Sequence, residues 1–80
     1  MKTSEAVASR IRELLKQKNM TQYGLCKKMA IHLNTLTNIM TAKNKSVNLN
    51  TIILVCRGLE VTVEHFFSDP IFESEELVIE

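Results

Sequence analysis

The chain has 80 residues, of which 45% are hydrophobic and 24% are charged, and its formal net charge at pH 7 is +1. A chain of this length folds as one domain with a modest core, and its composition excludes an intrinsically disordered protein. No apolar run approaches the roughly 20 residues that cross a membrane, and the N-terminus lacks a signal-peptide pattern, so we expect a cytoplasmic protein.

The charges are unevenly distributed along the chain. All ten lysines and arginines lie between Lys2 and Arg57, where only Glu5 and Glu13 oppose them, so this part carries a formal charge of +8. Residues 58–80 contain seven carboxylates and no base, which gives −7. A basic body of this kind suits a polyanion, because neutralised phosphates release their counterions. The sequence therefore predicts a basic body with an acidic tail.

The first predicted helix covers residues 4–18. Its apolar residues recur at the spacing of three and four that marks an amphipathic helix. Ser4 is a candidate N-cap, and Asn19 is expected to close the helix. The residues of the apolar stripe are Val7, Ile11, Leu14 and Leu15.

Two short amphipathic helices are predicted next, over residues 22–29 and 33–41, with a break of about three residues between them. Thr21 can cap the first of them. The inward positions of both are apolar: Leu25, Cys26, Met29, Leu36, Ile39 and Met40. The outward positions of the second include no carboxylate: Asn34, Thr35, Thr37 and Asn38. Helices joined so tightly cross at a steep angle, and the second can then project into a DNA major groove.

Two further helices are predicted over residues 49–57 and 63–67. Asn48 and Thr62 are their candidate caps, and Gly58 is expected to stop the first of them. Asp69–Pro70 ends the second, and residues 71–80 can form a short helix, an extended arm or a disordered tail. The expected core comprises Val7, Ile11, Leu14, Met20, Leu25, Cys26, Met29, Ile31, Leu36, Ile39, Leu49, Ile52, Cys56, Leu59, Val61, Val63 and Phe66.

The stretch from Met20 to Ala42 resembles the helix-turn-helix of the Cro/C1-type (Xre) DNA-binding family. The residues that match the family pattern are Thr21, Gln22, Leu25, Ile31, Thr35, Leu36 and Ile39. Cys26 stands where a small Ala is usual, Ala30 and Ala42 where Gly is usual, and His32 where Ser or Thr caps the second helix. Residues 46–67 are similar to the closing part of the same pattern. The resemblance implies an all-α, five-helix lambda-repressor-like DNA-binding domain over residues 1–69, followed by a short acidic C-terminal tail over residues 70–80 that offers a dimer or partner contact.

The resemblance also implies which residues meet DNA. The candidates for base contacts are His32, Leu33, Asn34, Thr35 and Asn38, and those for phosphate contacts are Gln22, Thr37, Lys43, Lys45 and Asn48. Asn can bond adenine in a bidentate way, and the reading helix has no Arg to bind guanine, so we expect an A·T-leaning site. A symmetric dimer would place two such helices one DNA turn apart. The dimer candidates are Leu54, Phe67, Ile71 and Phe72, unless these side chains simply cap the small core.

One departure from the family is informative. The family often pairs an Arg of the first helix with a Glu near the end of the third, and the matching residues here are Leu15 and Met40. Replacing both ends of an ion pair with packed hydrophobic residues can be neutral or stabilising, whereas replacing one end is costly. We therefore predict that Leu15 and Met40 touch.

The expected function is sequence-specific binding of double-stranded DNA by a transcriptional regulator, most simply a repressor. One alternative is an antitoxin whose acidic tail binds a basic toxin, and another is a protein-interaction module that has lost DNA binding. An enzyme is not expected, because the chain has only two glycines and no nucleophile–base arrangement. No cofactor is expected, and Cys26 and Cys56 are read as free buried thiols, since their spacing with His32 and His65 argues against zinc.

Overall fold

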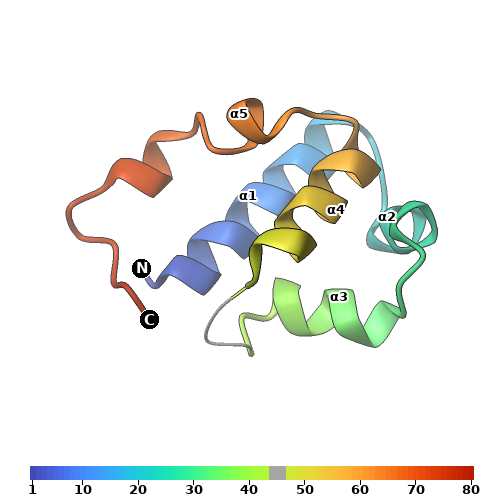
Figure 1. Cartoon of the computed structure of the whole chain (residues 1–80), viewed down its shortest axis with the longest axis horizontal. Coiled ribbons are helices and arrows are strands. Elements are labelled where there is room, and N and C mark those ends of the chain that lie inside the picture. Colours follow the sequence, from blue (N-terminus) through green and yellow to red (C-terminus); the bar gives the residue numbers. More distant parts are fainter. Residues whose placement is uncertain (44–46) are drawn as a thin grey trace.

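The computed structural model describes residues 1–43 and 47–80, and the regular structure over this range is helical (Figure 1). The elements are α1 (Thr3–Gln17), α2 (Gln22–Met29), α3 (Leu33–Met40), α4 (Leu49–Leu59), α5 (Val63–Phe66) and the short 3-10 helix η1 (Pro70–Glu73). The predicted all-α, five-helix architecture is therefore confirmed. None of the helices in the described part of the chain is long and apolar enough to cross a membrane.

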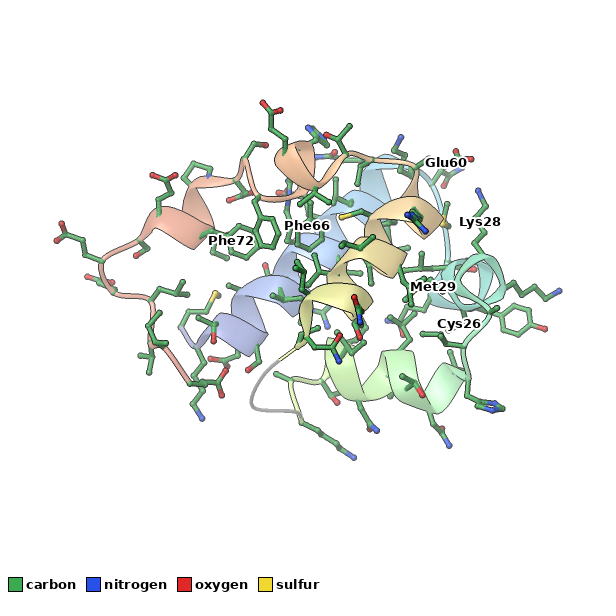
Figure 2. The ribbon with its side chains drawn as sticks, viewed as in Figure 1. Cys26, Lys28, Met29, Glu60, Phe66 and Phe72 are labelled. Atoms are coloured by element: carbon green, nitrogen blue, oxygen red, sulfur yellow. The ribbon has the colours of Figure 1, made fainter. Side chains whose placement is uncertain are left out.

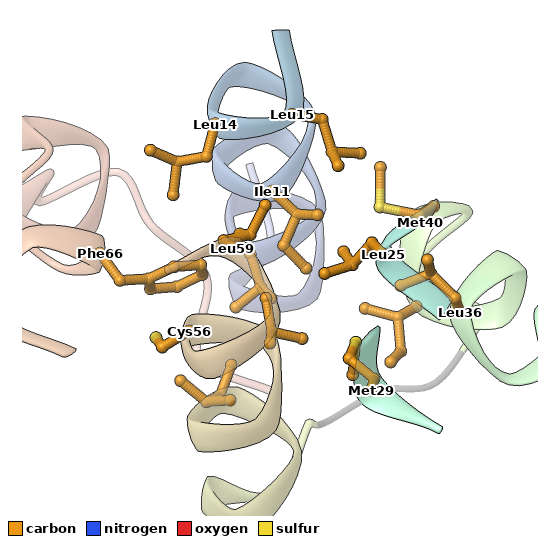
Figure 3. Close-up of a cluster of buried hydrophobic side chains, with 14 of the residues drawn as sticks. Ile11, Leu14, Leu15, Leu25, Met29, Leu36, Met40, Cys56, Leu59 and Phe66 are labelled. Carbon is orange, nitrogen blue, oxygen red and sulfur yellow. The ribbon is translucent and has the colours of Figure 1, made fainter. Parts of the chain in front are cut away.

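The core lies where α1 and α4 meet the α2–α3 pair. In this arrangement α1 packs on α3 and α4, while α2 contacts both α3 and α4. Most of the predicted core residues are buried there, as Figure 3 shows for a part of the cluster. Two predictions were wrong, because Leu49 is 65% exposed and Val63 is 40% exposed. Each is the first residue of its helix, directly after the N-cap, and its side chain lies beyond the edge of the core.

Leu15 and Met40 occupy the contact between α1 and α3. Both side chains are buried in the hydrophobic cluster, and they point toward one another, in agreement with the predicted contact (Figure 3). The end of α3 is also held by a polar contact, since the guanidinium of Arg12 donates to the carbonyl of Met40 at 3.0 Å. An apolar pair and one arginine thus join α1 to α3.

The predicted start of the first helix was wrong. Lys2 is the N-cap of α1, and Ser4 lies inside the helix, 3% exposed. The acceptor that Ser4 needs comes from the far end of the chain: its backbone N–H donates to Glu80 Oε1 at 2.9 Å, and its hydroxyl donates to the same oxygen. The tail therefore returns to the N-terminus of α1, where Val78 also exchanges backbone hydrogen bonds with Met1 and Thr3.

The contact with Ser4 has a consequence for the titration of Glu80. The hydrogen bonds from the Ser4 hydroxyl and backbone lower the pKa of the Glu80 carboxyl, because they favour its charged form. Since the folded state has the lower pKa, the contact contributes stability above the ordinary pKa and loses it as the pH falls through the lowered value.

Arg10 joins α1 to the end of α5. Its side chain is only 6% exposed, and it donates to the carbonyls of Phe66 at 2.8 Å and of His65 at 2.7 Å. The same guanidinium pairs with Glu13 and, at 3.4 Å, with Asp69. The last carbonyls of a helix have no partner within it, and this buried arginine satisfies two of them.

An aromatic cluster packs beside the contact of Arg10 with the end of α5, which we call the arginine clamp. The ring centroid of Phe66 lies 4.9 Å from that of Phe67 and 5.9 Å from that of Phe72, and the rings of Phe67 and Phe72 are 4.9 Å apart. Figure 2 shows Phe66 and Phe72 next to one another between the tail and the helical body. Through Phe72, η1 is anchored to the core.

Gly58 does not stop the fourth helix, so that prediction was wrong as well. Helix α4 continues to Leu59, and Glu60 takes the left-handed conformation at its end, with φ 59°. Gly58 is buried against α2, where a Cβ atom would lie 2.6 Å from Leu25 Cδ1 and 3.1 Å from Met29 Cγ. The missing side chain is what lets α2 and α4 approach so closely.

The two glycines provide a matched pair of substitutions. Gly58→Ala is expected to lower the free energy of unfolding by about 1–2 kcal/mol, because overpacking outweighs a gain of about 1 kcal/mol in helix propensity. Gly24→Ala, whose Cβ would meet Thr21 Oγ1 at 3.2 Å, is expected to stay within about 1 kcal/mol of the wild type. Urea unfolding followed by circular dichroism measures both, and equal effects would contradict the close approach of α2 and α4.

Candidate nucleic-acid interface

The α2–α3 unit has well-defined boundaries. Thr21 Oγ1 accepts a hydrogen bond from the Gly24 N–H at 3.0 Å, which caps α2 as predicted. Ala30 ends α2 in the left-handed conformation, with φ 55° and ψ 43°, and the extended His32 is the N-cap of α3. Figure 1 shows α2 almost end-on and α3 lengthwise, so the two helices cross at a steep angle.

Helix α3 has one anchored face and one free face. Leu36, Ile39 and Met40 are buried in the core. The predicted base-contact residues of its first turn are exposed together: His32, Leu33, Asn34 and Thr35. Asn38, one turn further on, is partly exposed. The side chain of His32 makes no capping hydrogen bond to α3, so its ring nitrogens are not used in capping the helix.

The predicted phosphate contacts lie on three elements. Gln22 is the first residue of α2, whose first backbone N–H groups have no partner within the helix and favour an anion. Thr37 and Lys43 are exposed on α3 and just after it, while Lys45 lies outside the described residues. Asn48 already has a structural role, since its Oδ1 accepts hydrogen bonds from the backbone and the hydroxyl of Thr51 and so caps α4.

Tyr23 was not singled out from the sequence. It is 59% exposed in the first turn of α2, and the ammonium of Lys27 lies 4.9 Å from its ring centroid. This cation–π contact joins residues four apart on a helix, a spacing that is visible in the sequence. On the same helix, Lys28 pairs with Glu60 at 3.5 Å, across the junction of α2 with the end of α4 (Figure 2).

Comparison with known proteins agrees with this geometry. Residues 10–70, well over half of the chain, match the model of the Cro/C1-type HTH DNA-binding domain. The chain belongs to the Cro/C1-type helix-turn-helix family. No curated protein and no solved structure matches it significantly. The family is one of DNA-binding domains, and this Cro/C1-type domain is accordingly a DNA-binding regulator of transcription.

The two cysteines of this Cro/C1-type domain are part of its core. Cys26 and Cys56 are buried and form no disulfide. Burial raises the pKa of both thiols, because it disfavours the thiolate. Within residues 1–43 and 47–80, no group of three or more His, Cys, Asp or Glu side chains is placed to hold a metal ion.

The four dimer candidates differ in exposure. Leu54 on α4 is 40% exposed and Phe67 after α5 is 38% exposed. Ile71 and Phe72 are half-buried, and the ring of Phe72 already packs on Phe66 and Phe67. In this Cro/C1-type domain, Leu54 and Phe67 therefore offer more free apolar surface than Phe72.

Proposed function

We propose that this Cro/C1-type domain is a transcriptional repressor that reads the major groove of double-stranded DNA with α3. The observation that carries the proposal is the contrast between the two faces of α3. One face is fixed in the core by three apolar side chains, and the other presents an exposed first turn with no carboxylate. A rigid helix with free polar side chains is the element that direct readout of base edges requires.

The residue types favour A·T base pairs. Asn34 and Asn38 can each bond adenine N6 and N7, while Leu33 and Thr35 can contact a thymine methyl group. Phosphates would be held by the first turn of α2 at Gln22 and by Thr37, Lys43, Lys45 and the amide of Asn48. Tyr23, which follows Gln22 on α2, and Lys27, whose ammonium lies over the Tyr23 ring, would add a hydroxyl and a positive charge to this phosphate-binding surface.

A homodimer would complete the proposed repressor. One small module makes few phosphate contacts, and two copies related by a two-fold axis read two half-sites. The partly exposed side chains of Leu54 and Phe67 support this part of the proposal.

The test is fluorescence anisotropy on duplex DNA from the upstream region of the gene, repeated at several salt concentrations. We expect binding to fall steeply with salt, because phosphate contacts release counterions. Asn34→Ala/Asn38→Ala should lower affinity at least tenfold, whereas Lys43→Ala should mainly reduce the salt slope by about 1. Gln17→Ala, an exposed amide at the end of α1, is the matched control and should leave binding unchanged.

Two results would overturn the proposal. Absence of binding at low salt would favour a domain that serves protein interactions only. Selection from a random duplex pool that returned a G-rich half-site would exclude the assignment of α3 as an A·T reader, because no arginine lies on its outer face.

A further inference from the structure

An apolar groove lies at the end of the molecule away from α2. Figure 1 shows the chain leaving the body after η1 and returning to the N-terminus. The groove has a volume of about 370 Å³ and lies between η1, this returning segment and the start of the chain. Its lining residues are Met1, Pro70, Ile71, Ser74, Glu76 and Leu77.

Carboxylates lie in and next to the segment that forms this groove, and one of them, Glu76, lines it. Glu73, Glu75 and Glu76 are exposed, and no ion pair within residues 1–43 and 47–80 involves any of them. Lys2 lies beside the tail, where its backbone forms a bridge with Val78 and its positive charge helps to lower the pKa of Glu80. Glu73, Glu75 and Glu76 outnumber this base, so this side of the molecule carries net negative charge and attracts positive charge.

Apolar surface continues from the groove onto the returning segment. Val78 is 52% exposed and Ile79 is 80% exposed, even though the hydrogen bonds of Val78 hold the segment against α1. Met1, which lines the groove, is 58% exposed. This end of the molecule therefore combines exposed apolar side chains with negative charge. A complementary partner surface would combine apolar side chains with positive charge.

We propose that this groove binds a cationic, apolar-faced segment of a partner protein. The apolar side chains of that segment would enter the groove, and its lysines or arginines would lie beside Glu73, Glu75 and Glu76. A second copy of this chain is a weaker candidate. Many of its basic residues lie on and around the α2–α3 unit, so pairing with the groove would be head-to-tail and would cover the DNA-binding surface. The groove lies at the end of the molecule away from α2 and from the first turn of α3 (Figure 1).

The test uses the full chain and a displayed library of random 12-residue peptides. Peptides are retained when they bind the wild type but fail to bind Glu73→Lys/Glu76→Lys. We expect the retained peptides to be enriched in lysine or arginine together with leucine, isoleucine or phenylalanine. A synthetic copy of one of them should bind the double variant at least tenfold more weakly and should shift backbone NMR signals of residues 70–77.

Controls separate this site from other surfaces. Glu60→Lys/Glu64→Lys makes the same change of charge on exposed residues elsewhere and should leave peptide affinity unchanged. Leu77→Ser should weaken peptide binding, and Val63→Ser, at an exposed apolar residue of α5, should not. DNA affinity of each folded variant is measured in parallel, so loss of DNA binding is not confused with loss of peptide binding. An empty selection, retained peptides without positive charge, or equal losses in both Glu pairs would overturn the proposal, as would selective self-association through the groove.

Discussion

Arg10→Met is expected to lower the free energy of unfolding by about 2–3 kcal/mol, because it removes charge-assisted hydrogen bonds and leaves a buried carbonyl without its partner. The variant keeps an aliphatic side chain against α5 but removes the arginine donor to the carbonyl of Phe66 and one of the donors to that of His65, which also accepts from Ser68. It also leaves Asp69 without its ion-pair partner. For a domain of this size the loss is a large part of the total stability.

Arg12→Met is the matched control, since it lies on the same helix and removes the same group. Arg12 is exposed, and within residues 1–43 and 47–80 it makes one hydrogen bond, to the carbonyl of Met40, so its loss should cost at most about 1 kcal/mol. Urea unfolding compares the two variants. If Arg10→Met does not fold, Arg10→Lys is used instead. It keeps the positive charge, and its urea midpoint should lie below that of the wild type. Similar midpoints for the Arg10 and Arg12 variants would show that the clamp on α5 adds little net stability.

Met40→Glu is expected to destabilise the domain by about 3 kcal/mol or more at pH 7, because it places an unpaired carboxylate in the core. Burial raises the pKa of the introduced carboxyl, so the folded state binds its proton more tightly than the unfolded state does. The loss of stability is then smaller near pH 4 and grows as the pH rises. Met40→Gln carries no titratable group and should show no such additional dependence on pH.

The double variant Leu15→Arg/Met40→Glu tests the contact between α1 and α3 directly. If the two side chains face one another, the introduced charges pair, and the double variant loses less stability than the two single variants together. We expect a coupling free energy of about 1–3 kcal/mol from the double-mutant cycle. Additive losses would place Leu15 and Met40 out of contact, contrary to their orientation in the core (Figure 3).

Local patterns predicted much of the helical framework. The bounds of α2 and the caps at Thr21, Asn48 and Thr62 follow from side chains within three residues of the atoms they bond. Ser4 was misread as a cap because its acceptor, Glu80, lies 76 residues away. Gly58 was misread as a stop because its role is decided by the packing of α2. The contact of Arg10 with α5 was not predicted, because it is made to backbone carbonyls, which the sequence does not distinguish; only its pairing with Glu13, three residues on, is local.

In the candidate site, too, features set by neighbouring residues were predicted, and features set by distant residues or by a partner were not. The buried and exposed faces of α3 follow from helical periodicity, which is a local property. The contacts of Asn34 and Asn38 with bases remain predictions, because they depend on how the domain docks on its partner. The groove beside η1 was not foreseen at all. It forms only because Phe72 anchors η1 to the aromatic cluster and Val78 pairs with the N-terminus of the chain.

The return of the acidic tail to the start of α1 also shapes the electric field of the whole molecule. The tail lies at one end of the long axis, which extends 34 Å, and the α2–α3 unit lies toward the other end (Figure 1). The charges are partly separated along this axis, because four of the nine carboxylates lie in the tail, whereas Glu60 pairs with Lys28 beside α2 and Asp69 pairs with Arg10. A nearly neutral protein thereby acquires a dipole moment. The field of a polyanion exerts a torque on such a molecule and turns it basic end first before contact. In the proposed mode of DNA binding, the acidic tail thereby helps to orient the approach of α3.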